Sequence, residues 1–146
     1  MPRLYLIRHG ETEANVEGRL LGSSESPLTA RGREQASTLA RELASTPISK
    51  IMSSPRQRAM DTAARLAEAK NSSVASDPRL TEIDFGAWEL QKRTDLLASP
   101  DADHLLRWEN EMVGPHGGED QHAFQARVSS FLESVQAESG PIRPSI

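Results

Sequence analysis

The chain lacks several features that would assign it to a common class of protein. None of its 146 residues is cysteine, which excludes a disulfide framework, a zinc site built on thiolates and a thiol nucleophile. No apolar run approaches the roughly 18 residues that a membrane helix needs. The N-terminus carries Arg3 and only a short apolar run before Arg8. We therefore predict a protein without a membrane segment, located in the cytoplasm, which is a reducing compartment.

An excess of positive charge is also missing. The chain has 17 Lys and Arg against 21 Asp and Glu, a formal net charge of −4. This argues against broad binding to nucleic acid, because neutralising a phosphate backbone takes clustered cations. Residues 1–70 nevertheless hold 11 basic and 8 acidic groups, whereas residues 71–146 hold 6 and 13. We therefore expect a small anionic ligand to bind to the first half of the chain.

Two further absences narrow the chemistry. The four histidines form no His-Glu-x-x-His pattern, and no Gly-x-x-x-x-Gly-Lys-Ser/Thr loop occurs. The sequence therefore predicts no metal site, no P-loop and no cofactor. Hydrophobic residues make up 36% of the chain and charged residues 26%, a balance that supports a buried core. Together with the length, this predicts one domain over residues 1–146.

The hydrophobic pattern alternates between strands and helices. Residues 4–7 form a short apolar run of β-formers, typical of a central strand that is buried on both faces. The alternation that follows predicts an α/β fold, with a three-layer α/β/α arrangement around a mostly parallel sheet. The further expected elements are a helix over 29–43, a strand over 48–54, a helix over 55–67, a weaker strand at 74–75 and a helix from about residue 122.

Residues 8–15 follow the first expected strand directly and carry side chains that suit a phosphate. Arg8 can bind phosphoryl oxygens as a fork, Gly10 lets the backbone approach closely, and Asn15 can donate an N–H. The fixed positive charge beside His9 disfavours a protonated imidazole. We expect His9 to be neutral, with a lone pair free to attack phosphorus. The alternative is a structural histidine held by hydrogen bonds at the end of a strand.

Two more segments complete a set of groups for phosphoryl transfer. Residues 53–59 place Arg56 at a second strand-to-helix turn, and residues 80–89 place Glu82 among apolar neighbours. Because ligands bind outside the carboxyl ends of parallel strands, we expect both strand ends to face one pocket. Taken alone, Arg56 fits a surface arginine at a helix start and Glu82 fits a solvated loop carboxylate. Only their combination with residues 8–15 points to chemistry on a phosphate.

With these segments the sequence resembles the histidine phosphatase superfamily, also called the phosphoglycerate mutase-like family. Five motifs occur in the order of that family over residues 3–135, which is far more specific than Arg-His-Gly alone. The resemblance implies a phosphoglycerate mutase-like fold and a cofactor-independent enzyme that acts on a small phosphate monoester. The motifs are Arg8-His9-Gly10, Pro27-Leu28-Thr29, Ser54-Pro55-Arg56, the segment 80–89, and Gly117-Gly118-Glu119 with Phe124 and Arg127-Val128.

The resemblance also implies a role for each candidate site residue. His9 corresponds to the nucleophile that becomes phosphohistidine. Glu82 corresponds to the acid that protonates the departing alcohol and then activates water. Such acid–base help contributes roughly 10²–10⁴ in rate. The residues implied to hold the phosphoryl group are Arg8, Arg56, Asn15 and, through its backbone amide, Gly22.

Within the superfamily, several stretches look most like the α-ribazole-5′-phosphate phosphatases of cobalamin synthesis. They are residues 11–18, 27–32, 88–90 and 108–127. The resemblance thus implies a phosphomonoester phosphatase with a phosphohistidine intermediate, and α-ribazole 5′-phosphate as a candidate substrate. Phosphoglycerate mutase is an alternative function. It is less favoured because the chain is short and has no room for the insertion that such mutases carry after the region of Glu82.

One part of the family pattern has no counterpart in this sequence. Family members continue after the last helix into a buried strand and a Ser-His-Gly motif with a second catalytic histidine, whereas residues 139–146 contain two prolines and no histidine. We therefore expect a domain that is incomplete at its C-terminus. Loss of one transition-state donor lowers activity roughly 10²–10³-fold. A degenerate, non-catalytic phosphate-binding remnant is the alternative function.

A sheet without one of its interior strands exposes unpaired backbone edges, which promote strand exchange or oligomerisation. The sequence leaves two interpretations open at this point. One is a truncated or frameshifted gene, and the other is a homodimer in which a second copy supplies the missing edge.

Overall fold

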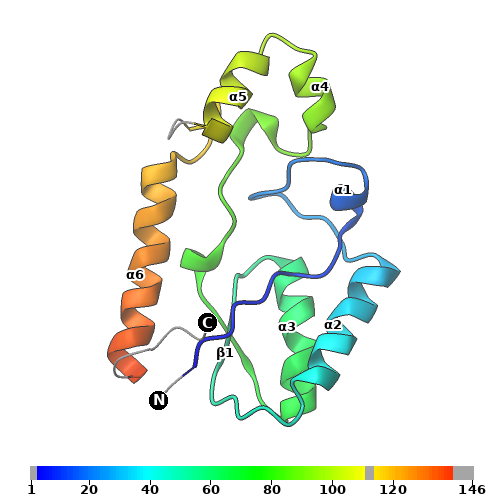
Figure 1. Ribbon diagram of the computed structural model, residues 1–146, viewed down its shortest axis with the longest axis vertical. Helices are drawn as coiled ribbons and strands as arrows, with labels where there is room; N and C mark the ends of the chain where they lie inside the picture. The colour runs from blue at the N-terminus through cyan, green and yellow to red at the C-terminus, as the bar shows by residue number, and fades with distance from the viewer. Residues whose placement is uncertain (1–2, 111–113, 140–146) are drawn as a thin grey trace.

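The computed structural model describes residues 3–110 and 114–139 and confirms the α/β class. Figure 1 shows β1 with α2 and α3 on one side and α6 on the other, while α4 and α5 lie together at one end of the molecule. The elements in chain order are α1 (Glu13–Val16), α2 (Ala30–Glu42), β1 (Ile51–Ser53), α3 (Gln57–Lys70), β2 (Val74–Ser76), the 3-10 helices η1 (Pro78–Leu80) and η2 (Gly86–Trp88), α4 (Arg93–Leu97), α5 (Ala102–Asn110) and α6 (Gln121–Ser139).

The two strands form a parallel pair, as the sequence predicts. Ile51 lies opposite Val74, and Ser53 lies opposite Ser76. In the part of the chain that the structure describes, the sheet consists of these two strands. The carboxyl end of β1 leads directly into α3, so the strand-to-helix turn at residues 54–56 has the expected position at the sheet edge.

Helices α2 and α3 confirm the periodic segments of the sequence and pack against each other. The Thr29 side chain accepts the Gly32 N–H at 2.9 Å and caps α2, as expected of threonine at this position. Helix α3 begins two residues later than predicted, because Arg56 still has extended backbone angles. It ends at Asn71, whose φ of 48° lies in the left-handed region that asparagine tolerates.

The prediction of a buried strand at residues 4–7 is wrong. Figure 1 draws the segment as a plain trace without a strand arrow, and Leu6 is 83% exposed. Among the described residues, no backbone hydrogen bond to another segment holds it. An apolar run of β-formers needs a partner strand to become a strand. Residues 4–7 and 48–53 line the same cavity, and the strand that pairs with β1 is β2.

Two clusters of buried side chains hold the fold together. The smaller one, around Ile51 and Leu66, fixes α3 against β1. The larger one is centred on Trp88, which has no exposed surface and donates its indole N–H to Asp101 at 3.3 Å. It joins the 83–88 segment to α4 and α5. Within residues 3–110 and 114–139, no helix has the length and apolar character needed to cross a membrane.

Candidate active site

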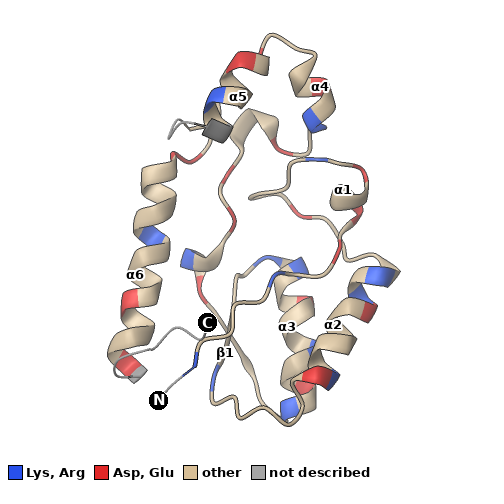
Figure 2. Ribbon diagram, viewed as in Figure 1, with Lys and Arg blue, Asp and Glu red and all other residues tan. Residues whose placement is uncertain are grey.

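A cavity of about 980 Å³ opens between the N-terminal segment, β1, the start of α3 and α6. Five side chains with chemistry of interest line it, namely Arg8, His9, Arg56, Arg58 and Glu82. Figure 2 shows basic residues at the beginning of α3 and along the N-terminal segment that passes it. The fold therefore brings most of the predicted site together in one place, with a cationic surround that suits an anion.

His9 has the protonation state that a nucleophile needs. Its ring is half-buried, and its Nδ1 lies 2.7 Å from the carbonyl oxygen of Gly10. Because a carbonyl only accepts, Nδ1 carries the hydrogen, and Nε2 keeps its lone pair. Burial is the largest cause that lowers the pKa of His9, and Arg58 and Arg8 lower it further against opposing effects of the Gly10 carbonyl and Glu82. The sequence-based expectation of a neutral ring relied on the cations, whereas burial has the greater effect.

The backbone directly after His9 is held against two helices. The Gly10 N–H donates to Thr62 Oγ1 at 3.0 Å, and the same hydroxyl donates to the Arg58 carbonyl one turn earlier on α3. A Cβ atom on Gly10 would overlap the carbonyl oxygen of Gly32 on α2. Gly10 therefore lets the backbone approach α2 closely. From the sequence we expected this glycine to allow a close approach to a phosphate instead.

Arg58 is a site residue that the sequence analysis missed. Its side chain is 2% exposed and points from the buried face of α3 into the cavity region, where its charge acts on His9. Nη1 donates to the Ser24 carbonyl at 2.8 Å, and Nη2 donates to the Gly22 carbonyl at 2.7 Å. These two bonds orient the guanidinium. Burial lowers the pKa of Arg58, but the pKa of an arginine starts so far above neutral pH that the group stays charged.

A signal for Arg58 was present in the sequence. Positions 58, 62 and 66 have the i, i+4, i+8 spacing that puts them on one face of a helix. Thr62 and Leu66 on this face are buried, as Arg58 is. A cation on the buried face of a helix is rare unless it is paired or functional. This pattern marks Arg58 as a candidate functional arginine of α3.

Arg56 lies at the start of α3 and lines the same cavity. Its Nη1 is 3.7 Å from the Glu25 carboxylate, which partly neutralises it. Its Nε is buried and has no hydrogen-bond partner among the described residues. Arg56 is therefore a second cation at the start of α3, and Glu25 partly neutralises its charge.

Glu82 lies at the mouth of the cavity. Its electrostatic effect reaches both His9 and Arg58, and its Oε1 accepts the backbone N–H of Ile83 at 2.9 Å. We expected a partly desolvated carboxyl between Leu80 and Ile83, but Glu82 is exposed. The reason is that Ile83 turns into the core around Trp88 while the preceding residue faces the opening.

Asn15 and Gly22 lie outside the cavity lining in the described part of the chain. Asn15 belongs to the cap of α1, where its Oδ1 accepts the Thr12 N–H at 3.1 Å. The Gly22 amide, which we expected to face phosphate, donates to Glu89 at 3.2 Å, and its carbonyl accepts from Arg58. A Cβ atom on Gly22 would overlap the Ile83 carbonyl oxygen. Gly22 therefore helps to shape the loop that orients Arg58, whereas Asn15 closes the cap of α1.

Glu89 accepts the hydrogen bonds that hold that loop in place. Its two carboxylate oxygens accept the backbone N–H groups of Gly22, Ser23, Ser24 and Phe85 at 2.7–3.2 Å. Burial raises the pKa of Glu89, but these hydrogen bonds outweigh burial and lower it overall. In the sequence, Glu89 stands out only as part of a motif. Its structural role depends on the path of a loop more than 60 positions earlier in the chain.

Comparison with known proteins identifies the family of the chain. The pattern of the histidine phosphatase superfamily (branch 1) matches residues 4–142 of the chain. The chain therefore belongs to the histidine phosphatase superfamily, and the resemblance found in the sequence is confirmed.

Individual relatives are similar over most of the chain. An adenosylcobalamin/alpha-ribazole phosphatase of Escherichia coli is 39% identical over 132 residues, which are 89% of this chain and 64% of the relative. A probable phosphoglycerate mutase of Proteus mirabilis is 37% identical, over 99% of this chain and 67% of the relative. The crystal structure of the alpha-ribazole phosphatase from Shigella flexneri superposes with a TM-score of 0.82 and 35% identity, over 94% of this chain and 69% of that one. The chain thus spans about two thirds of the length of these relatives.

Proposed function

We propose that the chain hydrolyses phosphomonoesters by transferring the phosphoryl group first to His9 and then to water. The observation that carries the proposal is the neutral His9 ring, whose Nδ1 is engaged by Gly10, in a cavity that also holds Arg8 and Arg58. This arrangement leaves Nε2 as the nucleophile and provides cations for the phosphoryl oxygens.

The reaction has two steps. In the first, His9 Nε2 attacks phosphorus, the ester P–O bond breaks, and Glu82 acts as the general acid that gives a proton to the leaving oxygen. In the second, water attacks the phosphorus of phosphohistidine, Glu82 takes a proton from that water, and the N–P bond breaks. Inorganic phosphate leaves, and His9 and Glu82 return to their starting states. Arg8 and Arg58 stabilise the negative charge on the non-bridging oxygens in both steps.

α-Ribazole 5′-phosphate is the substrate that we propose. Relatives named adenosylcobalamin/alpha-ribazole phosphatase from Escherichia coli and Salmonella typhimurium share 38–39% of residues with this chain. A cavity of about 980 Å³ lies at the upper end of the range for small-molecule sites, so it has room for a phosphate ester of nucleoside size. We propose the cytoplasm as its location, consistent with the absence of cysteine.

Phosphoglycerate mutase is the second candidate, because a similar relative carries that name. The two activities share the phosphohistidine and differ in the acceptor of the second step. The phosphatase releases inorganic phosphate from the substrate, whereas a mutase returns the phosphoryl group to another hydroxyl of its product. Measuring inorganic phosphate from α-ribazole 5′-phosphate and from 3-phosphoglycerate separates the candidates.

Hydrolysis of a chromogenic phosphomonoester tests the proposal directly. We expect turnover that a chelator leaves unchanged, since no step needs a metal. No turnover, combined with a rise in melting temperature on adding phosphate, would instead support a binding remnant without catalysis.

The two arginines at the start of α3 should contribute unequally. We expect Arg58→Gln to lower kcat/KM by roughly 10²–10³, because it removes an oriented, buried donor from the developing charge. Arg56→Gln should cost less than about tenfold, since Glu25 already compensates this cation. Steady-state kinetics on the two variants checks the difference, with Arg65→Gln on the exposed side of α3 as the control. Equal losses for the two variants would contradict the assignment of Arg58.

We also propose that two copies of the chain associate through residues 4–7. These residues expose apolar side chains and backbone groups that have no partner strand among the described residues. Sedimentation velocity should show a dimer, and Leu6→Lys should shift it towards monomer. A strictly monomeric protein at high concentration would contradict the proposal.

A further inference from the structure

The Glu82 carboxyl stands on a segment that no regular element holds. Helix η1 ends at Leu80 and η2 begins at Gly86, so residues 81–85 belong to neither a helix nor a strand. The Glu82 side chain is exposed, and its Oε1 accepts the N–H of the adjacent Ile83. A general acid acts only when it is held within reach of the atom that takes its proton. The position of this carboxyl therefore depends on what supports the segment.

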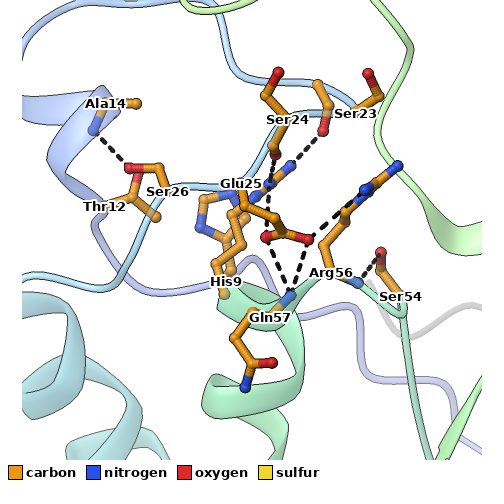
Figure 3. A network of polar contacts seen from close by, with 12 residues as sticks. His9, Thr12, Ala14, Ser23, Ser24, Glu25, Ser26, Ser54, Arg56 and Gln57 are labelled. Atoms are coloured by element: carbon orange, nitrogen blue, oxygen red, sulfur yellow. Dashed lines mark hydrogen bonds and ion pairs between the residues drawn. The ribbon is translucent and has the colours of Figure 1, made fainter.

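The cationic side of the site has its own support. Figure 3 shows Glu25 reaching from its loop to the Gln57 backbone and the Arg56 side chain. These contacts hold a loop against the start of α3. The support of Glu82 comes from another element, α6, which packs against η1 (Figure 1).

Arg127 on α6 directs its whole guanidinium at this segment and at Glu119. Nη1 donates to the carbonyl oxygens of Arg79 and Thr81 at 2.8 and 2.6 Å, and Nη2 donates to the carbonyl oxygen of Glu82 at 3.3 Å. Nε and Nη2 also donate to the two Glu119 carboxylate oxygens, at 2.6 and 2.7 Å. A guanidinium has five N–H groups, so these contacts use its full donor capacity.

Glu119 is itself fixed to the other end of the same segment. Its backbone N–H donates to the Asp84 carbonyl at 2.9 Å. A Cβ atom on the preceding Gly118 would overlap the same carbonyl oxygen, so the two backbones pack closely. The carboxylate that orients Arg127 thus comes from a loop that is bound two residues after Glu82. Arg127 and Glu119 together hold the segment on both sides of this carboxyl.

The ion pair has the geometry of a fixed support. The side chains of Arg127 and Glu119 are 22% and 19% exposed, and their two parallel hydrogen bonds form the fork that is specific to arginine and a carboxylate. The guanidinium also lies over the Phe124 ring, 4.8 Å from its centre. A lysine at this position would keep the charge but offer three donors without a fixed plane.

We propose that Arg127 is a positioning residue that, held by Glu119, fixes the backbone that presents the Glu82 carboxyl to the cavity. The inference rests on the proposed function, because it takes Glu82 as the general acid. Glu82 lines the cavity together with His9, and its charge acts on the His9 ring. A shift of about 1 Å in a catalytic group costs about 10²-fold in rate. The proposal gives a role to the motif around Glu119 and Arg127, which the two-step mechanism leaves unassigned.

The dependence of hydrolysis on the leaving group tests the proposal through turnover. Arg127→Lys keeps the charge and removes the fork. We expect its kcat/KM to fall about 10²-fold more for an alkyl phosphate, whose leaving oxygen needs a proton, than for p-nitrophenyl phosphate, whose phenolate leaves without one. Glu119→Gln should change this ratio in the same direction but less, because its amide oxygen still accepts one of the two bonds.

Arg79→Lys is the matched control. Arg79 joins η1 to α6 through the Ser130 carbonyl and the Ser134 hydroxyl, at 3.1 Å each, and its side chain makes no printed-length contact with residues 81–82 in the described part of the chain. The variant weakens the same packing and should lower the melting temperature. It should leave the ratio between the two esters unchanged.

The pKa of His9, followed by NMR on protein with labelled histidine, tests the proposal without turnover. The Glu82 carboxylate raises the pKa of His9 against the larger effect of burial, so Glu82→Gln should lower it further. Arg127→Lys should lower it as well, because a Glu82 carboxylate that is not held lies near His9 for less of the time. The double variant should show no further fall than Glu82→Gln alone. Melting curves confirm that each variant folds.

An unchanged pKa of His9 in Arg127→Lys overturns the proposal. An equal loss of kcat/KM with both esters also overturns it, since that result shows a general loss of structure. So does a His9 pKa that Glu82→Gln leaves unchanged, because Glu82 then does not reach His9. The proposed function fails differently: the wild type then hydrolyses neither ester, and the pKa of His9 decides whether Arg127 positions Glu82.

Discussion

Replacing His9 with alanine is expected to reduce phosphomonoester hydrolysis at least about 10³-fold while the fold is retained. The variant lacks the Nε2 lone pair, so no phosphohistidine forms, and direct attack by water has no positioned nucleophile. The backbone N–H of Gly10 still reaches Thr62, so the loop keeps its anchor. The measurement is steady-state kinetics together with an alkaline quench that preserves phosphohistidine, which should appear in the wild type alone.

His122→Ala is the matched control, because His122 is exposed on the first turn of α6. Full activity in the His9 variant would show that another group attacks phosphorus. The pH profile gives an independent check. Because burial and the nearby arginines lower the pKa of His9 from 6.5, the neutral ring persists below that pH. Activity should therefore fall on the acid side only below about pH 6.5.

Replacing Glu89 with glutamine is expected to destabilise the protein by roughly 2–4 kcal/mol at pH 7. Four backbone N–H groups donate to the carboxylate, and the amide nitrogen of glutamine cannot accept any of them. The loop that orients Arg58 loses the carboxylate that holds it in place, so kcat/KM should fall as well. Urea unfolding measures the loss of stability, and Glu68→Gln on the exposed side of α3 is the control.

The contribution of Glu89 also has a defined pH dependence. Its hydrogen bonds lower the pKa below the ordinary value of 4.5 despite burial. A carboxyl with a depressed folded pKa contributes its full stability above the unfolded pKa and loses it as the pH falls through the folded value. The difference between wild type and Glu89→Gln should therefore be constant from pH 7 down to about 5 and shrink below 4.5. A difference that grows on acidification would contradict this account.

Much of the architecture was predictable because its determinants are local. The cap at Thr29, the helical spacing of apolar residues in α2 and α3, and the β-formers at Val74 act over a few positions, and each produced the expected element. The order of the motifs, including Arg8-His9-Gly10, is sufficient to identify the superfamily from the sequence alone. The neutral His9 was predictable in direction, because a cation is its sequence neighbour.

The sequence by itself thus determined the class of fold and the family, and it pointed to His9 as the candidate nucleophile. Only the tertiary structure decided that residues 4–7 lie exposed, that Arg58 acts on His9, and that the Gly22 amide belongs to Glu89. Each of these depends on a partner far away in the chain: a second strand, two loop carbonyls or a carboxylate. Such pairings follow from how whole segments pack, because a hydrogen bond depends on distance in space and leaves no periodic trace in the sequence.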